Sequence, residues 1–120
     1  MRPHFRFEDL EIWQLAKALA VKFHKLADSL DKRWLYRYAE QLRAAGLSLT
    51  NNIAEGAGSV HAQEFKQVLN ISGRSLFEDA SMLLVFEALG LFSAAEIEAP
   101  LPDCDVLSRK ITNFSRSLSK

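Results

Sequence analysis

Two polar side chains at helical spacing are the first candidates for chemistry in this sequence. Asn52 falls on a repeat of apolar residues, and Glu55 follows three residues later at a neighbouring position of the same helix. A carboxylate there could act as an acid, a base or a ligand, but general acid–base catalysis needs a second positioned group, and none is evident. The pattern favours a structural polar network in which Asn52 and Glu55 fix the register of packed helices.

Other residue types that carry chemistry lack the partners that they would need. His61 and Glu64 have the reverse order of the Glu-x-x-His pairs of bundle metal sites, and the pattern occurs once. The glycines of segment 56–59 lack the Gly-Lys-Ser/Thr ending and preceding strand of a phosphate-binding loop. Cys104 has no recognisable partner histidine. We therefore expect no catalytic, cofactor or metal site, and a protein that is not an enzyme.

Charge is balanced overall but uneven along the chain. Fifteen Lys and Arg residues match fifteen Asp and Glu residues, yet residues 1–45 hold nine basic and six acidic side chains and residues 46–120 hold the reverse. The candidate contacts for nucleic acid or another partner are Lys32, Arg33, Arg37 and Arg43. Nearby aromatic side chains could stack on bases, namely Trp34, Tyr36 and Tyr38. A pI near 6.8 lies below the range of an independent nucleic-acid binder, so direct binding is disfavoured.

The elements that position these residues are predicted to be helices. Prolines occur only at positions 3, 100 and 102, and Leu and Ala total 33 residues against 10 for Val and Ile. Apolar residues recur at steps of three and four over 9–30, 34–56, 60–91 and 103–119. Short connections join antiparallel neighbours, so the sequence predicts an all-α, up-and-down four-helix bundle that forms a single domain over residues 1–120.

Capping residues refine these boundaries. Asp9 is the predicted N-cap of the first helix, and Ser93 with Glu96 matches a capping box that begins a short helical turn. Pro100 and Pro102 are expected to end that turn, so that Asp103 caps the last helix.

The segment 60–91 is apolar on more than one side. One stripe holds Leu69, Leu76 and Leu83 with Ser72 and either Asp79 or Ala80. Other apolar residues point away from that stripe, and a helix of this kind is usually covered on several sides. We expect another subunit to supply part of the cover, with Phe77, Leu84 and Val85 as the candidate subunit contacts.

Compartment follows from simpler features. A single cysteine cannot form an internal disulfide, no signal-like N-terminus is evident, and the longest apolar stretch is too short to span a membrane. We expect a cytoplasmic protein with no membrane contact.

Segment 41–56, which reads QLRAAGLSLTNNIAEG, carries a family resemblance. It resembles the signature of the four-helix-bundle family named after a protein encoded in 23S rRNA intervening sequences. Dispersed agreements include Trp13, segment 64–65 and segment 75–78. Thr50, Gly46, the order Gly73-Arg74 and the Pro100/Pro102 break depart from the family pattern, and they bear on the kink of the second helix and the shape of the fourth, not on the fold.

The resemblance implies a homo-oligomer, with a ring of five bundles known in the family and in similar accessory proteins of diversity-generating retroelements. It implies no enzymatic activity. We therefore expect a non-enzymatic, pentameric scaffold or adaptor of unassigned role that binds itself and a protein or ribonucleoprotein partner. The alternative is a nucleic-acid-binding accessory protein that uses the basic face of the first two helices.

Overall fold

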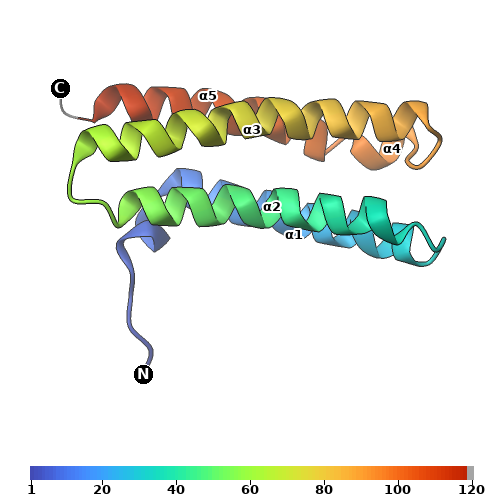
Figure 1. Ribbon diagram of the computed structural model, residues 1–120, viewed down its shortest axis with the longest axis horizontal. Coiled ribbons are helices and arrows are strands. Elements are labelled where there is room, and N and C mark those ends of the chain that lie inside the picture. Colours follow the sequence, from blue (N-terminus) through green and yellow to red (C-terminus); the bar gives the residue numbers. More distant parts are fainter. Residues whose placement is uncertain (119–120) are drawn as a thin grey trace.

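The computed structural model describes residues 1–118, and within this range its regular elements are all helical (Figure 1). They are the 3-10 turn η1 (Arg6–Asp9) and the helices α1 (Glu11–Asp31), α2 (Tyr36–Ala57), α3 (Ala62–Ala88), α4 (Ala94–Ile97) and α5 (Pro100–Ser117). The predicted all-α fold with four long helices is confirmed. Residues 119–120 lie outside the described part.

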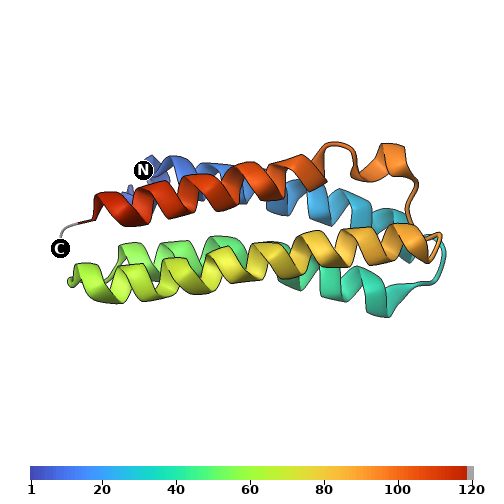
Figure 2. The same ribbon diagram turned by 90° about the horizontal axis from the view of Figure 1, so that it is seen from above.

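The long helices form two antiparallel pairs, α1 with α2 and α3 with α5 (Figures 1 and 2). The pairs stack so that α2 packs on α3 and α1 packs on α5. Buried apolar side chains from all four helices make one continuous cluster. α4 is a short turn beside the end of α3.

The seam of α1 largely matches its predicted residues, whereas the seam of α2 is displaced by one position in places. Ala39, Gly46 and Ile53 are buried where Tyr38, Ala45 and Asn52 were expected as possible seam residues. The cause is Gly46, whose missing side chain lets α2 approach α1 closely: a Cβ added there would lie 2.9 Å from the Cα of Ala20. α2 continues without interruption through Thr50.

α3 turns its predicted stripe to the core. Leu69, Ser72, Leu76, Asp79, Leu83 and Phe86 are all buried. The choice between Asp79 and Ala80 is thereby settled: the carboxylate side chain is buried, and Ala80 is half-buried. On α5, Leu107 and Ile111 are buried as expected.

Two predicted caps are wrong and one is confirmed. Leu10, not Asp9, is the N-cap of α1, and Asp9 pairs with His4. α5 begins at Pro100 rather than after the prolines, because the first turn of a helix does not need the N–H groups that proline lacks. The Ser93–Glu96 capping box is present, with N–O distances of 3.2 and 2.8 Å.

Two turns at the same end of the bundle have the same backbone pattern, the Schellman motif (Figure 1). After α1, the N–H of Leu35 donates to the carbonyl of Leu30 and that of Trp34 to Asp31. After α3, the N–H of Leu91 donates to Phe86 and that of Gly90 to Glu87. The left-handed position is Gly90 in one turn, with φ of 77°, and Trp34 in the other, with φ of 64°.

Candidate functional site

The outward face of α3 is the most apolar surface of the described chain. The three candidate subunit contacts lie on it with large exposed fractions: Phe77 72%, Leu84 47% and Val85 50%. They are exposed because the core takes the opposite side of the same helix. Together with Ala80, Ser81 and Ala88 they line a shallow groove of about 500 Å³, which we call the α3 face.

A second groove of about 840 Å³ lies between α2 and α3. α2 contributes Gln41, Ala44, Ala45 and Ser48 to it, and α3 contributes residues that include Ser75, Glu78, Asp79 and Met82. We call it the α2/α3 groove. Phe77 and Val85 line both this groove and the α3 face, so the two surfaces are continuous. The lining contains Glu78 and Asp79 but no Lys or Arg.

Asp79 is the unusual group of this region. Only 6% of its surface is exposed, and its Oδ2 has no hydrogen-bond partner among the described residues. Burial, with a smaller contribution from the charge of Glu78, raises the pKa of Asp79 to about 7. The Oγ of Ser72, two turns earlier on α3, is also enclosed without a partner.

Cys104 faces the same part of the core from α5. Burial, with smaller contributions from the charges of Asp79 and Asp103, raises the pKa of its thiol to about 12. A thiol that keeps its proton is a poor nucleophile. The carboxyl of Asp103 itself pairs with Lys22 of α1.

Asn52 and Glu55 do not meet in the core. Asn52 is half-buried and donates from Nδ2 to the Oγ of Ser48 at 3.3 Å, and Glu55 is exposed. The displaced seam of α2 explains this, because it buries Ile53 in place of Asn52. Sequence reasoning singled out these residues, whereas it placed Ser72 and, as an alternative to Ala80, Asp79 on the stripe of α3 without giving them a role. The available signal was their spacing of seven on an apolar stripe, which is the repeat of a packed seam.

The predicted basic face is divided by internal pairing. Arg43 lies 2.7 Å from a carboxylate oxygen of Asp28 and 2.6 Å from one of Asp31. Its guanidinium lowers the pKa of Asp28 mainly through their hydrogen bond. Arg33 donates to the carbonyl of Leu91 at 2.7 Å, which ties the two turns together. Arg33 and Arg43 therefore hold the bundle, whereas the other two candidate contacts, Lys32 and Arg37, are exposed with neither an ion pair nor a side-chain hydrogen bond among residues 1–118.

Trp34 is the most exposed aromatic side chain near these cations. Its exposed fraction is 80%, and that of Tyr36 is 55%. Tyr38 instead packs edge-on against Phe86, with ring centroids 5.3 Å apart. A tryptophan in the left-handed region is strained, and an aromatic ring held in water gains little from burial.

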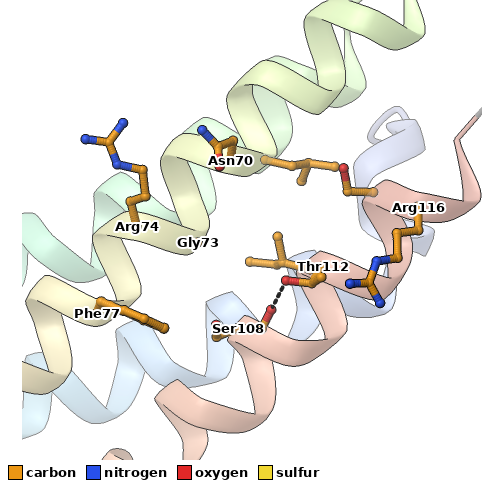
Figure 3. Close-up of a pocket in the computed structure, with 10 residues that line it drawn as sticks. Asn70, Gly73, Arg74, Phe77, Ser108, Thr112 and Arg116 are labelled. Atoms are coloured by element: carbon orange, nitrogen blue, oxygen red, sulfur yellow. Dashed lines mark hydrogen bonds between the residues drawn. The ribbon is translucent and has the colours of Figure 1, made fainter.

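A smaller groove of about 300 Å³ runs between α3 and α5 (Figure 3). Arg74 and Arg116 lie toward its two ends, and Phe77 and Ser108 face each other across it. The side chain of Arg74 points away from Thr112 and Ser108, so the two guanidinium groups do not converge on one point. The groove therefore lacks a set of hydrogen-bond donors that converge on one point, which an anion-binding site needs.

Residues 1–118 contain no group of three or more His, Cys, Asp or Glu side chains that could hold a metal ion. No helix in the same range is long and apolar enough to cross a membrane.

The family can be stated once this geometry is known. The model of the 23S rRNA-intervening sequence protein family matches residues 8–113, which include all four long helices almost completely. The chain belongs to the 23S rRNA-intervening sequence protein family. The resemblance drawn from segment 41–56 is thereby confirmed. A comparison with curated proteins found no match. The matched residues include the α3 face, the α2/α3 groove and Asp79, so these features lie within the part of the chain that the family model matches.

Proposed function

We propose that this chain is a non-enzymatic subunit of a homo-oligomer that serves as a scaffold or adaptor for a protein or ribonucleoprotein partner. The single observation that carries the proposal is the α3 face, on which Phe77, Leu84 and Val85 are about half exposed or more. Contiguous apolar surface of this kind is a typical site of protein association.

The α3 face and the adjoining α2/α3 groove together offer room for a stable contact. A helix of 27 residues is about 40 Å long at 1.5 Å per residue and about 10 Å wide, so one side of α3 presents about 400 Å². A standard stable interface takes about 800 Å² from each partner, so the contact should extend from α3 into the groove. The other long helices each leave fewer large apolar side chains exposed, such as Val21 on α1 and Val106 on α5.

A closed ring is the arrangement that we favour, with five copies as the number that the family resemblance implies. In a ring each copy presents two different surfaces, and contact between them closes the assembly. The acidic α3 side and the basic N-terminal half of the chain supply two surfaces of opposite charge.

A non-enzymatic role agrees with the chemistry of the described residues. Glu55 is exposed without a second catalytic group beside it, and the thiol of Cys104 keeps its proton at neutral pH. A reproducible turnover that Glu55→Gln abolishes would contradict this part of the proposal.

The test is the mass of the particle in solution, measured by light scattering and native mass spectrometry. The wild-type protein should form one multi-subunit species, and Phe77→Ser with Leu84→Ser should be monomeric. The matched control is Val106→Ser, which removes an exposed apolar side chain from α5, outside both proposed surfaces, and should leave the mass unchanged. A wild-type monomer at micromolar concentration would overturn the proposal.

Direct nucleic-acid binding is a second candidate, favoured by the exposure of Trp34 beside Lys32 and Arg37. An aromatic ring that stacks on a base and cations that contact phosphates are the two elements of single-strand binding. We restrict this candidate to the α1–α2 turn, because Arg33 and Arg43 are engaged inside the bundle.

Retardation of a labelled single-stranded RNA at low salt tests it. Trp34→Ala and Lys32→Glu with Arg37→Glu should each weaken binding, and only the charge change should reduce its salt dependence. Lys25→Glu on α1 is the control and should have a smaller effect. No retardation of the RNA by the wild-type protein would exclude this candidate.

A further inference from the structure

The buried carboxyl of Asp79 has no hydrogen-bond donor among the described residues of the single chain. Only 6% of the surface of Asp79 is exposed, and neither a hydrogen bond nor an ion pair joins its carboxyl to another described residue. Burying such a group without a partner is unfavourable, so it either keeps a proton or receives a donor. In the isolated protomer the pKa of Asp79 is raised to about 7, so the carboxyl keeps its proton below that pH.

The position of Asp79 decides where a donor can enter. The residue lies in the lining of the α2/α3 groove, beside Gln41, Ser48 and Ser75. Those side chains line the same groove, yet none of them forms a hydrogen bond with Asp79. The groove is open to solvent and shares Phe77 and Val85 with the α3 face. A copy that covers the α3 face therefore also covers the groove.

The charge around the groove defines the chemistry of the occupant. Glu78 and Asp79 are its charged lining residues, and no Lys or Arg lies among them. The basic excess of the chain is in residues 1–45, and Lys32 and Arg37 there are exposed without an ion pair among the described residues. A second copy thus carries the complementary group, whereas a partner with an acidic contact would be repelled.

We propose that Asp79 accepts a hydrogen bond from an ammonium, guanidinium or amide donor that the neighbouring copy inserts into the α2/α3 groove. The inference rests on the proposed self-association and names the polar contact at its centre. Two apolar surfaces can pack in several relative positions. A single acceptor buried between them favours the position in which the donor of the other copy reaches it.

Proton release accompanies this contact if the donor is a cation. Burial and the charge of Glu78 on α3 disfavour the ionised form of Asp79, while Cys104 on α5 is neutral and Asp103 near Cys104 is paired with Lys22. A cation from the neighbouring copy opposes these effects and stabilises the ionised carboxylate. Assembly of the wild-type protein should therefore become tighter as pH rises from 6 to 8.

The experiment compares assembly with the stability of the protomer. The dissociation constant is measured by dilution and mass photometry for wild type, Asp79→Leu, Asp79→Asn and the control Glu87→Gln, which removes a carboxylate of α3 that lines neither the groove nor the α3 face. Asp79→Leu should raise the constant at least about tenfold. In the monomeric Phe77→Ser/Leu84→Ser background the same change should leave the melting temperature equal or higher, because it removes an unpartnered buried carboxyl. Opposite effects on assembly and folding are the signature of a contact made across subunits.

Asp79→Asn keeps an acceptor oxygen and protects the test if Asp79→Leu does not fold. It should weaken assembly severalfold and abolish the pH dependence, and Glu87→Gln should change neither by more than about twofold. An unchanged dissociation constant in both Asp79 variants, with a wild-type protein that assembles, overturns this inference and leaves the proposed function intact. A monomeric wild type overturns both.

Discussion

The α1–α2 pair and the α3–α5 pair differ in how completely they satisfy their own groups. α1 and α2 are in close contact at Gly46 and Ala20, and Arg43 pairs with Asp28 and Asp31 across them. α3 buries an unpartnered carboxyl at Asp79 and exposes Phe77 on its other side. Among residues 1–118 the first pair buries no polar side chain without a partner, whereas the second has buried polar groups left for another molecule.

This difference locates function. A helix pair whose groups are satisfied contributes mainly to stability, whereas unmet apolar and polar groups on one helix mark a contact that is made elsewhere. The predictions below test the contrast on the folded protomer. Stability is measured by urea denaturation in the monomeric Phe77→Ser/Leu84→Ser background, so that association does not contribute.

The largest effect should come from the same substitution placed in each pair. Gly46→Ala puts a Cβ 2.9 Å from the Cα of Ala20, and a backbone atom cannot give way without moving a helix. We expect a loss of about 2 kcal/mol. Gly73→Ala meets no atom within 4 Å and improves helix propensity, so it should add about 1 kcal/mol. Equal effects at the two glycines would show that the α1–α2 contact is not tight.

The second prediction concerns pH. The pKa of Asp79 is raised from 3.8 to about 7 in the folded chain, so the folded state holds the proton more tightly than the unfolded state. Stability is therefore greatest below about pH 4, falls as pH rises toward 7, and is flat above it. We expect ionisation of Asp79 to lower the free energy of unfolding by about 2 kcal/mol. This is less than the full pKa difference would give, because water in the groove solvates part of the ionised form.

The measurement is the difference between wild-type Asp79 and Asp79→Asn in the same background, because other titrating groups cancel in it. The difference curve should fall between pH 4 and 7. A flat curve would mean that the carboxyl finds a partner within the protomer.

The third prediction compares the two Schellman turns. Trp34→Gly relieves a left-handed conformation at a bulky residue and should stabilise the protomer by about 1 kcal/mol. Gly90→Ala introduces the same strain and should destabilise it by about 1 kcal/mol. Opposite changes in stability in the two variants would indicate that Trp34 serves contact with another molecule rather than folding. A loss of stability in Trp34→Gly would contradict this.

Much of the fold can be predicted from spacing alone, because apolar residues at steps of three and four define α1, α3 and α5 whatever their neighbours are. The seam of α2 could not be placed in the same way. Gly46 carries no hydrophobic signal, and its burial depends on the small Ala20 of a different helix. For the same reason Asn52 was expected on the seam, and it lies half-exposed beside Ser48.

Only part of the candidate site could be predicted from the sequence. Excess apolar residues pointed to Phe77, Leu84 and Val85, since they do not fit the core stripe, and all three are exposed. Asp79 was on the stripe but could not be separated from Ala80, because a carboxylate is normally placed outside. Whether it has a partner depends on the facing residues of α2 and α5, which spacing along one helix does not reveal.

The smallest effect on stability should come from the ion pairs between α1 and α2. Arg43→Gln removes both contacts, to Asp28 and Asp31, yet exposed ion pairs are screened by water and contribute little. Because Arg43 lowers the pKa of Asp28, the stabilisation is present above the ordinary carboxyl pKa and is lost as pH falls below it. The variant should be slightly less stable than its parent at pH 7 and low salt, and equal to it in about 1 M salt, where the screening length is about 3 Å. A penalty that persists at high salt would mean that Arg43 acts through packing of its side chain, so that α1 and α2 depend on shape alone.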